Sequence, residues 1–337
     1  MQKIVNMNTM LSYQMSGSSS SSSNNTLLLL INAIPYLVSD KVLDLGASAA
    51  IFKATRTEDF MSVVIKIIFP TITSENLFRR EEDVMKNYLT SLNDLMMNAV
   101  KYYDSELVSV ESEEHGILIG LIEKSIIKEG GVELKIVKHL EMSLPVGVII
   151  MSYVPGRDLG YSIFRREKIS EEHGIQLISQ IMSTLVILHN HGIVHRDIKP
   201  LNIMTNDFNK YVLIDFGFAF HKEMKSFSVY AGTRRYVTNE LLIEAVEQKN
   251  KKTQVNVDIL FERYRQSDLF ALGITMYELM NPGYTFVSEK DNGIKDMETY
   301  VCCDERTKCG KIINLLIQKH YLSTNEMNQQ VESIFIE

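Results

Sequence analysis

The stretch His195-Arg-Asp-Ile-Lys-Pro-Leu-Asn202, followed by Asp215-Phe-Gly217, decides the fold of this 337-residue chain. Apolar residues recur at helical spacing from Ile175 to Leu188 before it, and Gly192 is suited to cap that helix. The strand-like run Tyr211-Val-Leu-Ile214 lies directly before Asp215. A single aspartate in a loop usually caps a turn. Here spacing, order and flanking elements agree, so the joint pattern carries the information.

Upstream of Gly156 the sequence favours strands, because short runs rich in branched residues alternate with small or polar turns. One helical stretch interrupts them between Glu75 and Met97, where apolar residues recur every three or four positions. The predicted strands are Lys41–Leu45, Ile51–Ala54, Ser62–Ile68, Leu107–Val110, Gly116–Ile122, Val132–Val137 and Val146–Tyr153.

Downstream of Gly156 the chain becomes helical. Ser170-Glu-Glu starts the helix before the deciding stretch, and a second clear helix covers Ser267–Leu279. After Met280 only Lys311–Gln318 and Asn325–Ile334 follow a helical period. The sequence therefore predicts an α+β protein with a sheet-rich first part and a helical second part.

From about Val38 to Met280 the chain resembles eukaryotic-type protein kinases of the serine/threonine class. The resemblance implies a two-lobed fold, with a small antiparallel sheet and one main helix in the N-lobe and a mainly helical C-lobe. The expected divisions are a Ser/Asn-rich disordered leader over 1–35, an N-lobe over 36–154 and a C-lobe over 155–337 that is compact or truncated at its end.

Through this resemblance the residues of the deciding stretch acquire roles in phosphoryl transfer, which needs positioned charge, metal ions and a group that orients the acceptor hydroxyl. Asp197 is expected to be the base, and Lys199 to neutralise charge on the transferring phosphoryl group. Asn202 and Asp215 are expected to hold Mg²⁺. Lys199 is also the signature of serine/threonine specificity.

Val63-Val-Ile-Lys66 resembles the strand whose lysine contacts the nucleotide phosphates. The glutamate that holds Lys66 is either Glu81 or Glu82, and Glu81 is preferred because it places Met85 one turn later as an apolar contact. Further along, Thr233 is expected to support Asp197, and Asp268 to hold the backbone of the catalytic loop.

The resemblance also implies an ATP site, although the phosphate-covering loop has one glycine, Gly46, where the family has three. Met151 to Val154 would form the hinge between the lobes, and Asp158 would accept from the ribose hydroxyls. The full set of expected nucleotide contacts is Gly46, Ser48, Ile51, Val64, Lys66, Met151, Ser152, Val154, Asp158 and Met204.

The segment Ala231-Gly-Thr233-Arg-Arg-Tyr236 resembles the end of a protein kinase activation segment. The usual Ala-Pro-Glu ending reads Thr238-Asn-Glu240, and no arginine late in the chain is a convincing partner for Glu240. Arg196 could bind a phosphate on the segment, on Ser226, Ser228 or Tyr230; an unmodified, constitutively ordered segment is equally compatible with the sequence.

The net charge, the apolar runs and the cysteine count limit the classes of partner and the cellular environment that we expect for this protein. The formal charge of −7 argues against a nucleic-acid binder, and protein substrates are the partners that the resemblance implies. The apolar run Leu27–Val38 is interrupted by Asn32 and Pro35 and is too short to span a membrane. Three clustered cysteines favour reduced thiols over a disulfide framework or a zinc site. We expect a cytoplasmic or nuclear protein of undetermined oligomeric state.

The function expected from the sequence is ATP- and Mg²⁺-dependent phosphorylation of serine or threonine in proteins. A pseudokinase scaffold is the main alternative, because the glycine loop and the Ala-Pro-Glu ending are altered. A small-molecule kinase would share the aspartates and the asparagine, but it would not need the Gly232-Thr233 segment.

Overall fold

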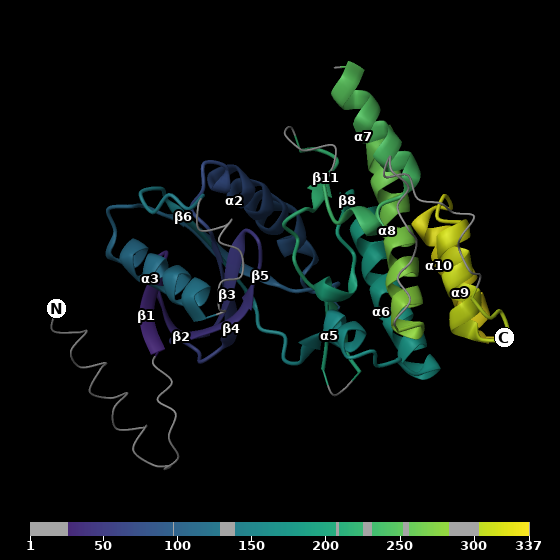
Figure 1. The fold of residues 1–337 in the computed structure, drawn as a ribbon, viewed down its shortest axis with the longest axis horizontal. Coiled ribbons are helices and arrows are strands. Elements are labelled where there is room, and N and C mark those ends of the chain that lie inside the picture. The colour runs from purple at the N-terminus through teal and green to yellow at the C-terminus, as the bar shows by residue number, and fades with distance from the viewer. Residues whose placement is uncertain are drawn as a thin grey trace, which may run out of the picture.

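The computed structural model describes residues 26–96, 98–128, 139–206, 209–224, 231–251, 256–282 and 303–336. Figure 1 shows a sheet with helices on one side of the molecule and a group of long helices on the other. The predicted two-lobed α+β fold is confirmed. Within the described ranges, no helix is both long enough and apolar enough to cross a bilayer.

The N-lobe contains one antiparallel sheet with the strand order β1-β2-β3-β4-β6-β5. Neighbouring strands are joined mostly by short turns, and β6 returns to lie between β4 and β5. The strands are β1 (Thr26–Ile31), β2 (Ile34–Leu45), β3 (Ala49–Arg56), β4 (Ser62–Ile68), β5 (Tyr102–Val108) and β6 (Val146–Ser152).

The expected leader over 1–35 is too long, because β1 already begins at Thr26 and β2 begins at Ile34. Asn32 and Ala33 both have positive φ, 47° and 63°, as a two-residue hairpin turn requires. Leu29 and Ile31 on β1 are fully buried, so pairing with β2 removes apolar side chains from water. Residues 1–25 lie outside the described ranges.

Alternation along β4 directs its side chains to two different cores. Val63, Ile65 and Ile67 face the apolar cluster that includes α3 (Glu113–Lys128). Lys66 and Ile68 face the opposite side, where α2 (Ser74–Asp83) packs. The sheet therefore lies between two helices, and its strand period sets the direction of Lys66.

The predicted strand Gly116–Ile122 is wrong, because this segment lies inside α3. The buried positions of the helix are His115, Leu118, Leu121, Ile122 and Ser125, a three- and four-residue spacing that forms one helical stripe. Strand alternation would have buried every second residue instead. The predicted strand Val132–Val137 lies outside the described residues.

The sheet ends at Ser152, and the first helix of the second half begins at Leu159. The C-lobe helices are α5 (Leu159–Phe164), α6 (Glu171–Asn190), α7 (Asn239–Lys251), α8 (Val257–Met280), α9 (Lys308–Gln318) and α10 (Thr324–Ile336). Short strands lie among them: β7 (Arg157–Asp158), β8 (Ile193–Val194), β9 (Ile203–Thr205), β10 (Tyr211–Leu213) and β11 (Phe220–His221).

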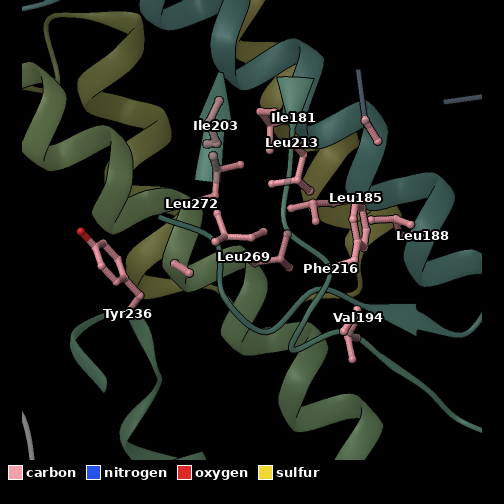
Figure 2. Close-up of a cluster of buried hydrophobic side chains, with 14 of the residues drawn as sticks. Ile181, Leu185, Leu188, Val194, Ile203, Leu213, Phe216, Tyr236, Leu269 and Leu272 are labelled. Atoms are coloured by element: carbon pink, nitrogen blue, oxygen red, sulfur yellow. The ribbon is translucent and has the colours of Figure 1, made fainter. Parts of the chain in front are cut away.

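The core of the C-lobe lies between α6, α8 and the segment that connects them. Figure 2 shows Phe216 close to Leu185 and Leu188 of α6, in one apolar cluster with Leu269 and Leu272 of α8. Helix α6 begins as predicted, because the Ser170 hydroxyl accepts from the backbone N–H of His173. The two long helices therefore pack against Phe216, in the segment that carries Asp215.

Candidate active site

Lys66 lies between two carboxylates that come from different lobes. Its Nζ lies 2.6 and 2.8 Å from the two carboxylate oxygens of Glu81 on α2. The same nitrogen donates to Oδ1 of Asp215 at 2.8 Å. Glu82 faces elsewhere and accepts from the Ser105 hydroxyl, so the ion pair forms with Glu81.

This charge cluster, in which Lys66 and Glu81 are buried and Asp215 is partly exposed, shifts the pKa values of its members. The positive charge of Lys66 lowers the pKa of Asp215 to about 2. Burial works against the ammonium of Lys66, but the charges of Asp215 and Glu81 outweigh it and raise the pKa of Lys66. Burial raises the pKa of Glu81, and the charge of Lys66 offsets part of that rise. Lys66 and Asp215 are therefore charged at neutral pH.

Asp197 is buried, and both of its carboxylate oxygens accept hydrogen bonds. Oδ1 accepts from the backbone N–H and the hydroxyl of Thr233, both at 2.8 Å. Oδ2 accepts from Nδ2 of Asn202 at 2.9 Å and lies 2.7 Å from Nζ of Lys199. Lys199 also donates to the Thr233 hydroxyl at 2.9 Å. The carboxylate is thus held by three side chains and one backbone group.

The backbone before Asp197 is held by Asp268 on α8, whose side chain is 1% exposed. The carboxylate of Asp268 accepts from the backbone N–H groups of His195 and Arg196, both at 2.8 Å. These two bonds satisfy donors in a loop where Arg196 has a φ of 67°. His195 in turn bonds to the carbonyl of Ile214 at 3.0 Å, which connects the loop to the strand before Asp215.

Gly232 is required by the close approach of the segment before Thr233 to this loop. Its φ is +92°, and a Cβ at this position would lie 2.0 Å from the carbonyl oxygen of Arg196. Any side chain would force the two segments apart. The glycine therefore allows Thr233 to reach Asp197.

Arg196, which could bind a phosphate on the activation segment according to the sequence, is buried in the structure. Its exposed fraction is 6%, and its Nε donates to the carbonyl of Phe218 at 2.6 Å. Its guanidinium lies over the ring of Tyr264, 4.7 Å from the centroid, and 5.6 Å from that of Phe220. The three expected phosphate acceptors, Ser226, Ser228 and Tyr230, lie outside the described residues.

The residues expected around a nucleotide come from four separated segments. Gly46 and Ser48 are exposed in the β2–β3 turn, which is closed by a 2.9 Å bond from Gly46 N–H to the Ala49 carbonyl. A Cβ on Gly46 would meet that carbonyl at 3.6 Å, an ordinary contact. The other expected contacts are spread over five strands. They are Ile51 on β3, Val64 on β4, Met151 and Ser152 on β6, Val154 just after β6, Asp158 on β7 and Met204 on β9.

Two of these residues already have local partners. The backbone N–H of Ser152 donates to the Lys101 carbonyl at 2.9 Å, and its hydroxyl accepts from Lys101 N–H at 3.0 Å. Asp158 caps α5, because its Oδ1 accepts from Tyr161 N–H at 3.1 Å. Asp158 also pairs with Met204 between β7 and β9, so these two expected contacts are adjacent.

Arg235 and Tyr236, at the end of the predicted activation segment, hydrogen-bond to α8. The Tyr236 hydroxyl donates to Glu278 at 2.8 Å, and Arg235 donates to the Tyr236 oxygen at 2.7 Å. Glu240, for which the sequence offered no arginine, lies 4.0 Å from Nε2 of His320.

Sequence reasoning missed a buried network that extends from Asp268 to the last helix. His189 lies between Oδ2 of Asp268, at 3.1 Å, and the Thr324 hydroxyl, at 2.7 Å. The helical period buries His189, but its link to Thr324 crosses 135 residues and has no sequence signal. Tyr264 was also missed, although it stands one helical turn before Asp268.

Comparison with known proteins gives a family match over nearly the whole chain. Residues 37–335 match the family model described as the protein kinase domain. The chain is 34% identical over 143 residues to serine/threonine-protein kinase cds1 of Schizosaccharomyces pombe. The matched residues make up 42% of this chain and 29% of that protein.

Two further relatives are more distant. The chain is 29% identical over 145 residues to serine/threonine-protein kinase PknB of Mycolicibacterium smegmatis, covering 43% of this chain and 21% of that protein. It is 26% identical over 165 residues to mitogen-activated protein kinase 14 of Xenopus laevis, covering 44% and 41%. The matches thus extend over less than half the length of each of these three relatives.

Proposed function

The chain belongs to the protein kinase family, and we propose that it is a serine/threonine protein kinase that transfers the γ-phosphoryl group of ATP to hydroxyl groups of proteins. The observation that carries the proposal is the arrangement around Asp197, whose carboxylate is held by Thr233, Asn202 and Lys199. A carboxylate fixed in this way can accept the proton of an acceptor hydroxyl without first having to reorient.

The oxygen donors near Asp197 suit magnesium. Asp215 supplies a carboxylate whose pKa of about 2 keeps it ionised, and Asn202 supplies its amide oxygen, because Nδ2 is already bonded to Asp197. Magnesium is commonly held by one or two carboxylates together with substrate phosphates, so a larger acidic cluster is not required. When bound, the ion would neutralise charge on the phosphates.

We infer that two lysines supply positive charge to the phosphates of ATP. Lys66, oriented by Glu81, is proposed to contact the first two phosphates of ATP. Lys199 lies 2.7 Å from Asp197 and is proposed to neutralise charge that develops on the phosphoryl group. Because Lys199 donates to both Asp197 and Thr233, it also helps to fix the base.

We propose that ATP binds against β3, β4, β6 and β9. Ile51, Val64 and Met204 are partly buried and would contact the adenine, while the backbone of Ser152 and Val154 would supply its polar contacts. Asp158 would exchange its helix-capping bond for the ribose hydroxyls, and Gly46 and Ser48 would lie over the phosphates.

A pseudokinase scaffold is the second candidate, and the β2–β3 turn is the observation that favours it. The turn is short, is closed by its own hydrogen bond, and contains a single glycine. Fewer backbone N–H groups are then available to approach phosphates. Nucleotide binding without efficient transfer would follow.

The test is transfer of labelled phosphate from ATP and magnesium to generic protein substrates, comparing the wild type with Asp197→Ala and Lys66→Ala. Lys41→Ala is the matched control, because Lys41 is an exposed lysine on β2. We expect label with the wild type and the control, and a loss of at least about a hundredfold in both site variants. Label that persists in both would overturn the proposal, and tight nucleotide binding without label would favour the scaffold.

A further inference from the structure

Arg196 is a buried cation whose immediate surroundings are aromatic. Its side chain lies against the rings of Tyr264 and Phe220, which are themselves in edge contact with centroids 5.6 Å apart. The guanidinium also hydrogen-bonds to the Tyr264 oxygen. A stacked arginine with a hydrogen-bonded phenol is held in both position and orientation.

The carboxylate of Asp268 also acts on Arg196, and its oxygens already accept other hydrogen bonds. They accept from the backbone of His195 and Arg196 and lie against His189. Burial lowers the pKa of Arg196, and the hydrogen bond to the Tyr264 hydroxyl and the charge of Asp268 offset that cost only in part. The ring and the hydroxyl of Tyr264 therefore contribute to the stabilisation of this buried cation.

Tyr264 occupies its position because of the helix that carries it. It is fully buried on α8, four residues before Asp268, and this spacing places both side chains on the same face. Asp268 holds the backbone of the loop, and Tyr264 holds the side chain of the same arginine. The helix thus grips the residue before Asp197 at two points.

A residue of the N-lobe also interacts with Arg196 and Tyr264. Arg80, the neighbour of Glu81 on α2, acts electrostatically on both Tyr264 and Arg196. Its Nε is buried and has no hydrogen-bond partner among the residues that the structure describes. A guanidinium group from each lobe therefore interacts with the same phenol.

We propose that Tyr264 is a positioning residue for phosphoryl transfer, which holds Arg196, and with it the loop that carries Asp197, in working geometry without a phosphate on the activation segment. This inference rests on the proposed function. It predicts a kinase whose activity does not depend on phosphorylation, and whose catalytic loop loosens when the aromatic ring of residue 264 is removed.

The experiment uses the full chain after phosphatase treatment, with its unphosphorylated state verified by mass spectrometry. Tyr264→Phe keeps the ring and Tyr264→Leu removes it. Phe270→Leu is the matched control, because Phe270 is a buried ring on the same helix that packs edge-on against His320. Amide hydrogen exchange over 195–202, kcat and KM for ATP are measured for each protein.

We expect the unphosphorylated wild type to be active. Tyr264→Leu should lower kcat by about tenfold or more with little change in KM, while Tyr264→Phe stays within about threefold of the wild type. Exchange over 195–202 should rise in Tyr264→Leu above the level in Phe270→Leu, and this readout does not require catalysis.

Three results would overturn the inference. The first is a wild type that is inactive when unphosphorylated and active once phosphorylated, because a phosphate would then hold the arginine. The second is equal kcat in Tyr264→Leu and Phe270→Leu. The third is equal hydrogen exchange over 195–202 in those two variants, which decides against Tyr264 even if no protein transfers phosphate. Failure of the proposed function appears separately, as a wild type without activity in either phosphorylation state.

Discussion

At the scale of single residues, the site consists of charges that hold one another in place. Lys66 lies between Glu81 and Asp215, and Asp197 accepts hydrogen bonds from groups on both sides of its carboxylate. Each acid has a local reason for its orientation, and the donors come from segments far apart in the chain. The loss of one partner should therefore reorient the remaining groups rather than only remove a contact.

Glu81 should matter far more than its neighbour. Glu81→Gln removes the charge that holds Lys66, so we expect kcat/KM for ATP to fall by about tenfold to a hundredfold. Glu82→Gln is the matched control, because Glu82 contacts Ser105 and Arg79 instead of the lysine. Steady-state kinetics of both variants checks this, and equal losses would contradict the assignment of the pair.

The charge of Asp215 should make the folded state sensitive to acid. Lys66 lowers the pKa of this carboxyl from 3.8 to about 2 in the folded protein. A depressed folded pKa stabilises the protein above the unfolded value, and this contribution is lost as the pH falls from about 4 towards 2. The side chain is 39% exposed, so water screens part of the effect.

Urea unfolding of the wild type and Asp215→Asn measures this contribution. The difference in unfolding free energy between the two proteins should shrink as the pH is lowered through that window, because the asparagine does not titrate. A difference that stays constant from pH 5 to pH 2.5 would show that Lys66 does not stabilise the carboxylate.

At the scale of elements, the two faces of the N-lobe sheet serve different purposes. The face with Lys66 and Ile68 packs on α2 and presents the ion pair, whereas the face with Val63, Ile65 and Ile67 packs on α3. Helix α3 therefore covers apolar surface that the sheet would otherwise expose. Its contribution is to the stability of the lobe rather than to the chemistry.

Helix α3 can be tested by its own burial pattern. Leu121→Ala removes a fully buried side chain and should lower the free energy of unfolding by about 2–5 kcal/mol. Ile127→Ala, on the same helix, should cost little, because Ile127 is 77% exposed. Chemical denaturation of the two variants gives the comparison, and similar losses would contradict the helical stripe.

At the scale of the whole molecule, the loop that carries Asp197 is connected to α10. Asp268 on α8 contacts the loop, His189 on α6 contacts Asp268, and Thr324 on α10 contacts His189. Arg265 adds a second connection, donating to the Leu322 carbonyl at 2.7 Å. The end of the chain thus takes part in the support of the site.

Thr324→Ala should therefore weaken more than the last helix. It leaves a buried ring nitrogen of His189 without its partner, which costs about 1–3 kcal/mol, and it should also lower kcat through Asp268. Asn325→Ala is the control, because Asn325 bonds to Asn190 at the exposed surface. Thermal unfolding and steady-state kinetics on both variants check the prediction. A loss confined to Asn325→Ala would contradict it.

Much of the fold could be predicted because its signals are local. The strand period of β4 and the helix cap at Ser170 can be recognised from neighbouring residues. Both β4 and α6 are present as predicted. Helix α3 was misread because its branched residues, such as Ile117 and Ile119, favour strands on composition alone. This segment is a helix because the helical conformation buries one stripe of its apolar side chains against the sheet. That burial is a tertiary contact, which composition does not reveal.

The sequence by itself determined the order and identity of the chemical groups, from Lys66 through Asp197 and Asn202 to Asp215, because each follows a short local pattern. The spacing from Glu81 to Met85 already favoured Glu81 over Glu82 as the partner of Lys66, and the structure agrees. Tertiary packing was needed to show that Arg196 stacks on Tyr264, 68 positions later, and that Thr324 contacts His189, 135 positions earlier. Such pairings depend on how helices and sheet pack, and no local pattern encodes them.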